Sequence, residues 1–139
     1  MITKTPSYDL SSRNTFRMKV KCALYVEVTE EADFQALDWD SLPQPVFVMG
    51  GGSNLLFRGD FPGTVLHVGI GGITASDGSV TCGAGVVFDD FCAWAASENL
   101  WGPENLSLIP GECGASAVQN IGAYGVEAKD IITGILVKL

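Results

Sequence analysis

The sequence predicts an α+β fold made of two small subdomains, residues 1–72 and 73–139. Three observations lead to this prediction. Apolar and polar residues alternate over residues 18–28, which is typical of a strand with one buried face. Apolar residues recur at helical spacing over residues 86–100. A glycine-rich stretch, residues 71–78, lies between these two segments and marks the junction between the subdomains.

The composition is that of a folded, acidic protein. Of the 139 residues, 47% are hydrophobic and 17% are charged, so a core can form and global disorder is not expected. The net charge of −8 argues against a nucleic-acid partner, because such proteins present a basic face. No apolar run approaches the roughly 20 residues of a membrane helix, and the first residues lack the apolar region of a signal peptide. We therefore expect a cytoplasmic protein with no membrane partner.

The first forty residues are expected to contain one strand and one helix. Residues 1–12 are polar and are predicted to be a loose lead-in to the strand. After the strand, Thr29 can cap a helix whose first turn is acidic, as the helix dipole favours. This helix is predicted to reach Leu42, because Pro43 follows it.

A glycine-rich loop follows the short apolar strand predicted at Val46–Met49. Three glycines lead into a serine and an asparagine: Gly50, Gly51, Gly52, Ser53 and Asn54. Glycine lets a ligand approach bare N–H groups, and successive N–H groups form a concave anion site that suits phosphate oxygens. The loop is therefore predicted to bind a diphosphate, although a tight structural turn has the same composition. It is neither a Walker loop nor a Rossmann fingerprint, because the lysine and the glycine spacing of those motifs are absent.

The middle of the chain is predicted to add two strands and a hairpin. Residues 55–57 and 64–69 have strand-like composition, and His67 in the second segment is expected to be structural. Asp77 and Gly78 lie between two short β-prone runs and favour a two-residue hairpin turn.

An acidic pair, Asp89 and Asp90, opens the helix predicted at residues 86–100. Neighbouring helical residues point about 100° apart, so these carboxylates cannot share one substrate group. We interpret both as part of the solvated face of the helix.

A long segment, residues 102–125, is rich in small residues and only weakly periodic. Loops of this length in compact domains are usually functional or disordered, and the apolar residues in this one oppose disorder. A flat ligand could pack against the backbone at its small residues, Gly111, Gly114, Ala115 and Ser116. Residues 131–139 are then predicted to form a strand.

The four cysteines, Cys22, Cys82, Cys92 and Cys113, are far apart in the sequence. Without a secretion signal we expect them to be free thiols. No C-x-x-C motif occurs and His67 is the single histidine, so no metal site is expected.

The glycine loop and the long segment together resemble one known family. The matching residues are Asn14-Thr15-Phe16, residues 50–57, Gly83-Ala84-Gly85, and residues 105–125 with their Ile-Pro-Gly and Gln-Asn-Ile-Gly-Ala-Tyr-Gly runs. On these residues the chain resembles the UDP-N-acetylenolpyruvoylglucosamine reductases of bacterial cell-wall synthesis over nearly its whole length. The glycine–serine–asparagine loop is shared with many flavin oxidases of the same fold, whereas the second run is far more specific to the reductases.

The resemblance implies a fold and a cofactor. The fold is the FAD-binding fold of the vanillyl-alcohol-oxidase type, with non-covalent FAD between two subdomains, of which the second is incomplete in this chain. The residues implied on the diphosphate side are Gly50, Gly51, Gly52, Ser53, Asn54, Leu55 and Leu56, called the first set below. Those implied on the other side are Ile109, Pro110, Gly111, Gly114, Ala115, Ser116 and Gly122, called the second set. Ala117 and Cys113 depart from the commonest family residues, and we expect neither to abolish binding.

The resemblance also implies a reaction. In the family, NADPH delivers hydride to the flavin, which passes it to the enolpyruvyl double bond of UDP-N-acetylglucosamine enolpyruvate to form UDP-N-acetylmuramate. A serine then protonates the product, assisted by an arginine and a glutamate. All three come after the end of this chain in the family, so no catalytic residue is assigned here. We expect an N-terminal portion without the substrate domain, inactive alone, that self-associates through the surface the missing part would cover.

Two other functions stay open from the sequence. An FAD-dependent sugar or alcohol oxidase of the same fold would release hydrogen peroxide, whereas the reductase forms a reduced enol ether. A nucleotide-binding domain without a redox role would not retain flavin.

Overall fold

The computed structural model describes residues 1–138 and divides into two compact units, Met1–Ile70 and Gly71–Leu139. That these are two FAD-binding subdomains, with limits at residues 1–72 and 73–139, stays a prediction. Each unit has its own hydrophobic core.

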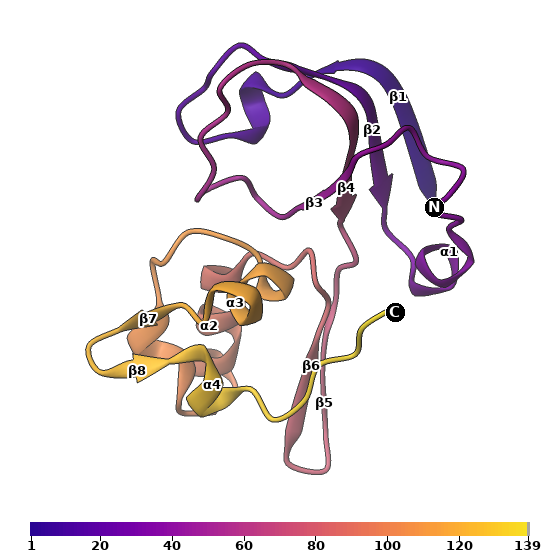
Figure 1. Ribbon diagram of the computed structural model, residues 1–139. Coiled ribbons are helices and arrows are strands. Elements are labelled where there is room, and N and C mark those ends of the chain that lie inside the picture. The colour runs from indigo at the N-terminus through magenta and orange to yellow at the C-terminus, as the bar shows by residue number, and fades with distance from the viewer. Residues whose placement is uncertain (139) are drawn as a thin grey trace. The chain divides into compact units, whose positions relative to one another are not determined.

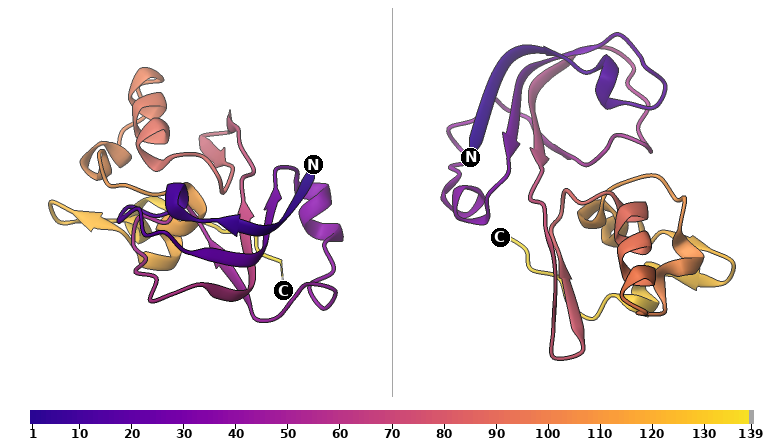
Figure 2. Two further views of the ribbon diagram at one scale, coloured as in Figure 1. Left: turned by 90° about the horizontal axis from the view of Figure 1, so that it is seen from above. Right: turned by 180° about the vertical axis from the view of Figure 1, so that it is seen from behind.

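The first unit is built on a four-stranded sheet in the order β1-β2-β4-β3 (Figure 1). β1 (Ile2–Asp9) is antiparallel to β2 (Lys21–Val28), while β2 and β3 (Val46–Met49) both run parallel to β4 (Phe61–Val68). Parallel neighbours require a crossover connection, and the one from β3 to β4 contains the glycine loop instead of a helix. This connection and the 3-10 turn η1 (Ser11–Arg13) lie at one end of the sheet, away from α1 (Glu31–Ala36) (Figures 1 and 2).

Both faces of this sheet are covered. Tyr25 and Val65 belong to one apolar cluster, and their neighbours Val26 and Leu66 belong to another. Successive strand residues point to opposite faces, so the two clusters lie on opposite sides of the sheet. The prediction of a single buried face for β2 is therefore wrong, because Tyr25 is buried as well as Val26.

Four local predictions in the first unit are also wrong. The predicted lead-in contains β1, whose backbone pairs with β2 along nearly its whole length, so its polar sequence needs no buried face. The hydroxyl of Thr29 donates to the Met1 carbonyl instead of capping α1. The helix ends at Ala36, because the Asp38 side chain accepts from a nearby backbone N–H and competes with the helical pattern. Residues 55–57 form no strand, although Leu55 and Phe57 pack against the core.

The second unit combines a hairpin with short helices. Its elements in chain order are β5 (Ile73–Ser76), β6 (Ser79–Cys82), α2 (Phe88–Ser97), η2 (Pro103–Leu106), α3 (Cys113–Gln119), β7 (Gly122–Ala123), β8 (Val126–Glu127) and α4 (Ala128–Ile131). The β5–β6 hairpin turns at Asp77 and Gly78, as predicted, and both residues have positive φ. In the views, the small β7–β8 hairpin extends outward from α2 and α3 (Figures 1 and 2).

The predicted helix at residues 86–100 is confirmed as α2. Its buried positions, Phe88, Cys92 and Ala95, are on the face that the spacing indicated, and Phe88 and Cys92 pack with Leu106 from η2. Two other predictions here are wrong. The long segment is no continuous loop, because it contains η2, α3 and β7. In the segment predicted as a strand, Ile131 is the last residue of α4, and residues 132–138 form no strand. The predicted end of that strand, Leu139, lies outside the described residues.

Within residues 1–138, no helix is both long enough and apolar enough to cross a membrane.

Candidate functional site

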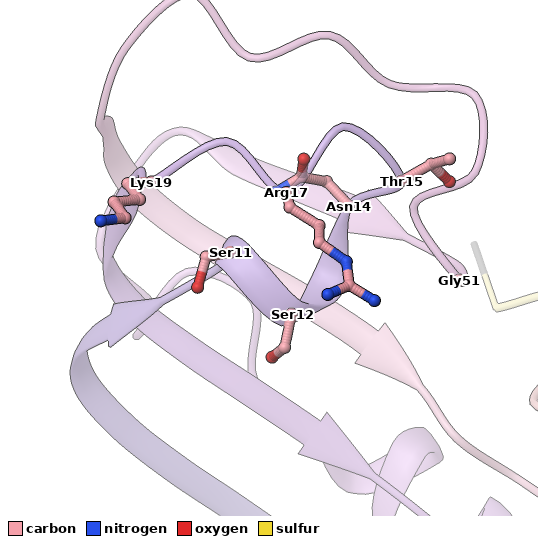
Figure 3. A pocket seen from close by; sticks show the side chains of 7 residues that line it. All are labelled: Ser11, Ser12, Asn14, Thr15, Arg17, Lys19 and Gly51. Atoms are coloured by element: carbon pink, nitrogen blue, oxygen red, sulfur yellow. The ribbon is translucent and has the colours of Figure 1, made fainter.

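An open cavity of about 710 Å³ lies beside the glycine loop in the first unit (Figure 3). It is lined by Ser11, Ser12, Asn14, Thr15, Arg17, Lys19 and Gly51. In Figure 3, Lys19 and Gly51 lie at opposite ends of the group of lining residues. The Arg17 side chain points toward the turn that carries Ser12. Hydroxyls, two cations and a glycine backbone form a donor set that suits an anionic ligand.

Asn14 builds the wall of this cavity. Its buried amide donates to the carbonyls of Leu10 (2.8 Å) and Met18 (3.2 Å), and its oxygen accepts from the Met18 N–H (2.9 Å). These bonds close the loop that presents Thr15, Arg17 and Lys19. Asn14 therefore has a structural role in the family motif that the sequence analysis singled out.

The glycine loop packs tightly against the same segment. Gly52 is buried at φ +70°, and a Cβ added there would lie 1.9 Å from the Arg13 carbonyl oxygen. The Thr15 N–H donates to the Gly52 carbonyl (3.4 Å). Gly51 stays exposed at the cavity. The middle glycine thus faces the cavity while the third one holds the loop in place.

The rest of the first set surrounds this turn. Gly50, Ser53 and Leu55 are half-buried, whereas Asn54 and Leu56 are exposed. The residues of the first set are thus contiguous in the fold, but of these residues only Gly51 lines the cavity.

A partly buried polar cluster joins η1 to β2 and β4. The Nδ1 atom of His67 is 3.0 Å from Oε1 of Glu27, which also pairs with an Arg13 Nη2 at 3.3 Å. The Arg13 guanidinium lies over the Tyr25 ring, 5.3 Å from its centroid. His67 is 6% exposed, so it is a structural histidine, as expected.

In the second unit, backbone bonds join the turn after β6 to the start of α3. The Cys113 N–H donates to the Val86 carbonyl (2.8 Å) and the Gly114 N–H to the Ala84 carbonyl (2.9 Å). A Cβ on Gly114 would lie 2.8 Å from the Cβ of Ala84. This close approach explains a glycine inside a helix, where it otherwise costs about 1 kcal/mol relative to alanine.

Four members of the second set meet at this junction. Pro110, Gly111, Ala115 and Ser116 line a small indentation of about 10 Å³, together with Phe88, Glu112, Gln119 and Ile121. That is room for about one water molecule. Ile109, Gly114 and Gly122 lie outside it. The Ser116 hydroxyl donates to the Cys113 carbonyl (2.6 Å), so its donor is satisfied within α3.

Asp89 has a role that the sequence analysis missed. Its Oδ1 accepts from the Ser107 hydroxyl (2.6 Å) and from the Leu108 N–H (2.7 Å). These hydrogen bonds, first that from Ser107, lower the pKa of Asp89 below its ordinary value of 3.8. Asp89 therefore lies on the exposed face of α2, as interpreted, and in addition anchors the segment that follows η2.

Arg17 and Lys19 are the site residues that the sequence analysis missed. Lys19 lies at the start of the predicted strand and Arg17 just before it, and neither belongs to the glycine motif. A signal was present, since these are two of only 8 Lys and Arg residues in a chain with 16 Asp and Glu. Within the described part of the chain, no group of three or more His, Cys, Asp or Glu side chains is placed to hold a metal ion.

The family model described as "FAD binding domain" matches residues 22–139. UDP-N-acetylenolpyruvoylglucosamine reductase from Bacteroides fragilis is 48% identical over 134 residues, which cover 92% of this chain and 40% of the relative. The enzyme of the same name from Porphyromonas gingivalis is 45% identical over 135 residues, again 40% of its length. The chain thus spans about 40% of the length of these curated relatives.

A solved structure, UDP-N-acetylenolpyruvylglucosamine reductase from Thermus caldophilus, has a TM-score of 0.68 at 21% identity. The alignment covers 91% of this chain and 45% of that one. It shows the fold, and with the family match it confirms the predicted α+β FAD-binding fold and the resemblance to the reductases. The chain therefore belongs to the family of FAD-binding domains.

Proposed function

We propose that this chain is the FAD-binding portion of an NADPH-dependent UDP-N-acetylenolpyruvoylglucosamine reductase, which acts in peptidoglycan precursor synthesis. The observation that carries the proposal is 48% identity to a relative of that name across 92% of the chain. The substrate would be UDP-N-acetylglucosamine enolpyruvate, with NADPH as hydride donor. The chain alone is expected to be inactive, because it spans 40% of that relative.

We assign the first and second sets, as defined above, to FAD contact. Support for the first set comes from the cavity beside Gly51, where Arg17 and Lys19 would face the negative charges of the diphosphate. The donor set fits this group, because the chain is otherwise acidic and gathers two cations and three hydroxyls here. Support for the second set comes from its small residues, four of which share one indentation.

FAD, when bound, supplies a ring system that accepts and donates hydride. The residues of this chain bind and orient it. The Gly51 backbone gives the diphosphate close access, and Asn14 holds the cation-bearing loop in place. We propose non-covalent binding, since the single histidine, His67, is buried against Glu27 and not exposed for attachment.

Flavin retention tests this proposal directly. The purified chain is incubated with FAD and desalted, and its visible spectrum is recorded. Retained bands shifted from those of free FAD support the assignment, and release of intact FAD on denaturation supports non-covalent binding. A chain that retains no flavin, even when extended toward the full length of the relatives, contradicts it.

The roles of Arg17 and Lys19 can be tested by neutral substitutions. We expect Arg17→Gln and Lys19→Gln each to weaken FAD binding by roughly 2- to 5-fold, as exposed charge pairs do, with less effect in high salt. Lys4→Gln is the matched control, because Lys4 is an exposed cation of the same unit outside the cavity. Equal losses in all three variants would show that only overall charge matters.

A further inference from the structure

Two thiols of the second unit lie in direct contact. The Sγ atoms of Cys82, at the end of β6, and Cys113, at the start of α3, are 3.3 Å apart. A disulfide bond is about 2.05 Å long, so closure requires the sulfurs to approach by little more than about 1 Å. The two residues are 31 positions apart in the sequence, so this contact is a product of the fold.

We infer that Cys82 and Cys113 form an oxidation site, at which a hydroperoxide converts the thiol pair into a reversible intramolecular disulfide. The inference depends only on this contact and does not require the proposed flavin function.

Backbone hydrogen bonds hold the segments around Cys82 and Cys113 in positions that suit such a crosslink. The Cys113 N–H and the Gly114 N–H donate to the Val86 and Ala84 carbonyls, just after Cys82 in the chain. The segments that carry the two sulfurs are therefore already paired, so side-chain rotation alone can bring the sulfurs together. Both side chains are half-buried, which leaves the site open to a small oxidant.

The hydrogen bond between the sulfurs also distinguishes the thiol that reacts first with the oxidant from the thiol that closes the disulfide. It lowers the pKa of the Cys82 thiol and raises that of Cys113, because a thiolate at Cys82 accepts a hydrogen bond from the Cys113 thiol. The thiolate is the reactive form of cysteine, so Cys82 is the residue that reacts first with an oxidant. The other two cysteines are buried, and burial raises the pKa of Cys92 to about 11 and also raises that of Cys22.

The chemistry balances with one equivalent of hydrogen peroxide. The Cys82 thiolate attacks one peroxide oxygen, the O–O bond breaks, and hydroxide leaves, so that Cys82 becomes a sulfenic acid. The Cys113 sulfur then attacks Sγ of Cys82, the S–O bond breaks, and the oxygen leaves as water with the Cys113 proton. Two thiols are oxidised and one peroxide is reduced, and a dithiol reductant reverses the reaction.

The crosslink would join β6 to α3 across the turn at residues 83–86. That turn already packs on Gly114. Closing a loop of this length restricts the unfolded chain, so the oxidised protein is expected to unfold at a higher Tm than the reduced one.

The test uses the reduced 139-residue chain, treated with one equivalent of hydrogen peroxide, alkylated, digested and analysed by mass spectrometry. We expect a peptide that links Cys82 to Cys113, alkylated Cys22 and Cys92, and an intact mass lower by about 2 Da before alkylation, since two thiol hydrogens leave. Dithiothreitol should restore the original mass. A Cys82 sulfinic acid beside an alkylated Cys113, or a crosslink between two chains, would overturn the inference.

Two serine variants separate the roles of the thiols. In Cys113→Ser, oxidation should stop at a Cys82 sulfenic acid, which dimedone traps. Cys92→Ser is the matched control, because Cys92 belongs to the same unit but donates to the Pro103 carbonyl, and it should form the crosslink like the original chain. A Cys82–Cys92 link, or an unchanged Tm on oxidation, would contradict the assignment.

Discussion

At the scale of single residues, Asn14 stabilises the loop that lines the cavity of the first unit. It is 5% exposed and makes three hydrogen bonds, to backbone groups of Leu10 and Met18. An amide side chain has donors and an acceptor, so it can satisfy carbonyls and an N–H group at once. Asn14 thereby shapes the loop that presents Arg17 and Lys19 to the cavity.

Replacement of Asn14 should therefore weaken both folding and ligand binding. We expect Asn14→Ala to lower the free energy of unfolding by about 2 kcal/mol, because it leaves buried backbone groups without their partners. Urea denaturation measures this change, and flavin retention measures the effect on the cavity. Thr15→Ala is the control for the denaturation measurement alone, since Thr15 is exposed in the same loop but also lines the cavity. If both variants have the same stability, the role of Asn14 is wrong.

At the scale of elements, Asp89 connects α2 to the segment that follows η2. It lies in the first turn of α2, where the helix dipole favours a carboxylate, and binds Ser107 and Leu108. Leu108 has a positive φ of 64° and is 84% exposed, so few apolar contacts hold this segment. The carboxylate of Asp89 is thus an important local restraint on residues 107–108.

Removal of this carboxylate should free the segment. We expect Asp89→Ala to speed hydrogen exchange of the Leu108 amide by roughly tenfold, because its charged hydrogen-bond acceptor is lost. Asp90→Ala is a matched control, since Asp90 lies in the same helical turn and has the same relation to the helix dipole. Equal acceleration in both variants would mean that the dipole, and not the hydrogen bonds, protects the amide.

The same restraint should depend on pH. The pKa of Asp89 is lowered in the folded protein, so its contribution is fully present above the ordinary value of 3.8 and is lost as pH falls through the lower, folded value. Protection of the Leu108 amide should therefore persist at neutral pH and fall below about pH 4. In Asp89→Ala this pH dependence should be absent. A loss of protection between pH 6 and 8 would point to another titrating group.

At the scale of the whole molecule, the chain contains separate cores. The first unit packs two clusters on its sheet, and the second packs Phe88, Cys92 and Leu106 between α2 and η2. Leu106 is fully buried, whereas Leu108, two residues later, is 84% exposed. The two leucines therefore differ in burial by nearly the full possible range.

Truncation of Leu106 should destabilise its own unit first. We expect Leu106→Ala to cost about 3 kcal/mol, because it removes a buried side chain and leaves a cavity. Hydrogen exchange should accelerate in α2 and α3 and stay unchanged in β2 and β4. Leu108→Ala is the control and should have little effect. A uniform acceleration across residues 1–138 would show that the chain opens as one cooperative unit.

Much of the local structure could be predicted because it depends on neighbours in the sequence. Period-two alternation located β2, although Lys21–Val28 is shorter than predicted, and the spacing of Phe88, Cys92 and Ala95 located α2. Asp77 and Gly78 tolerate positive φ, so the turn of the β5–β6 hairpin was also readable. The glycine run predicted accessible backbone, and Gly51 lines a cavity, while ligand binding there stays a proposal.

Other features could be decided only by tertiary structure. β1 is a strand because its backbone pairs with β2. α3 forms where its small residues pack against the turn at Ala84. The cavity gathers residues from two chain segments, 11–19 and the glycine loop. The scarcity of cations in the sequence could have drawn attention to Arg17 and Lys19, but only the fold places them beside Gly51. The Cys82–Cys113 contact likewise joins positions that are distant in the sequence. Local propensity thus determined the helices, turns and strands with strong patterns, whereas backbone pairing and close packing between distant segments determined the rest, because those energies exist only once the segments have met.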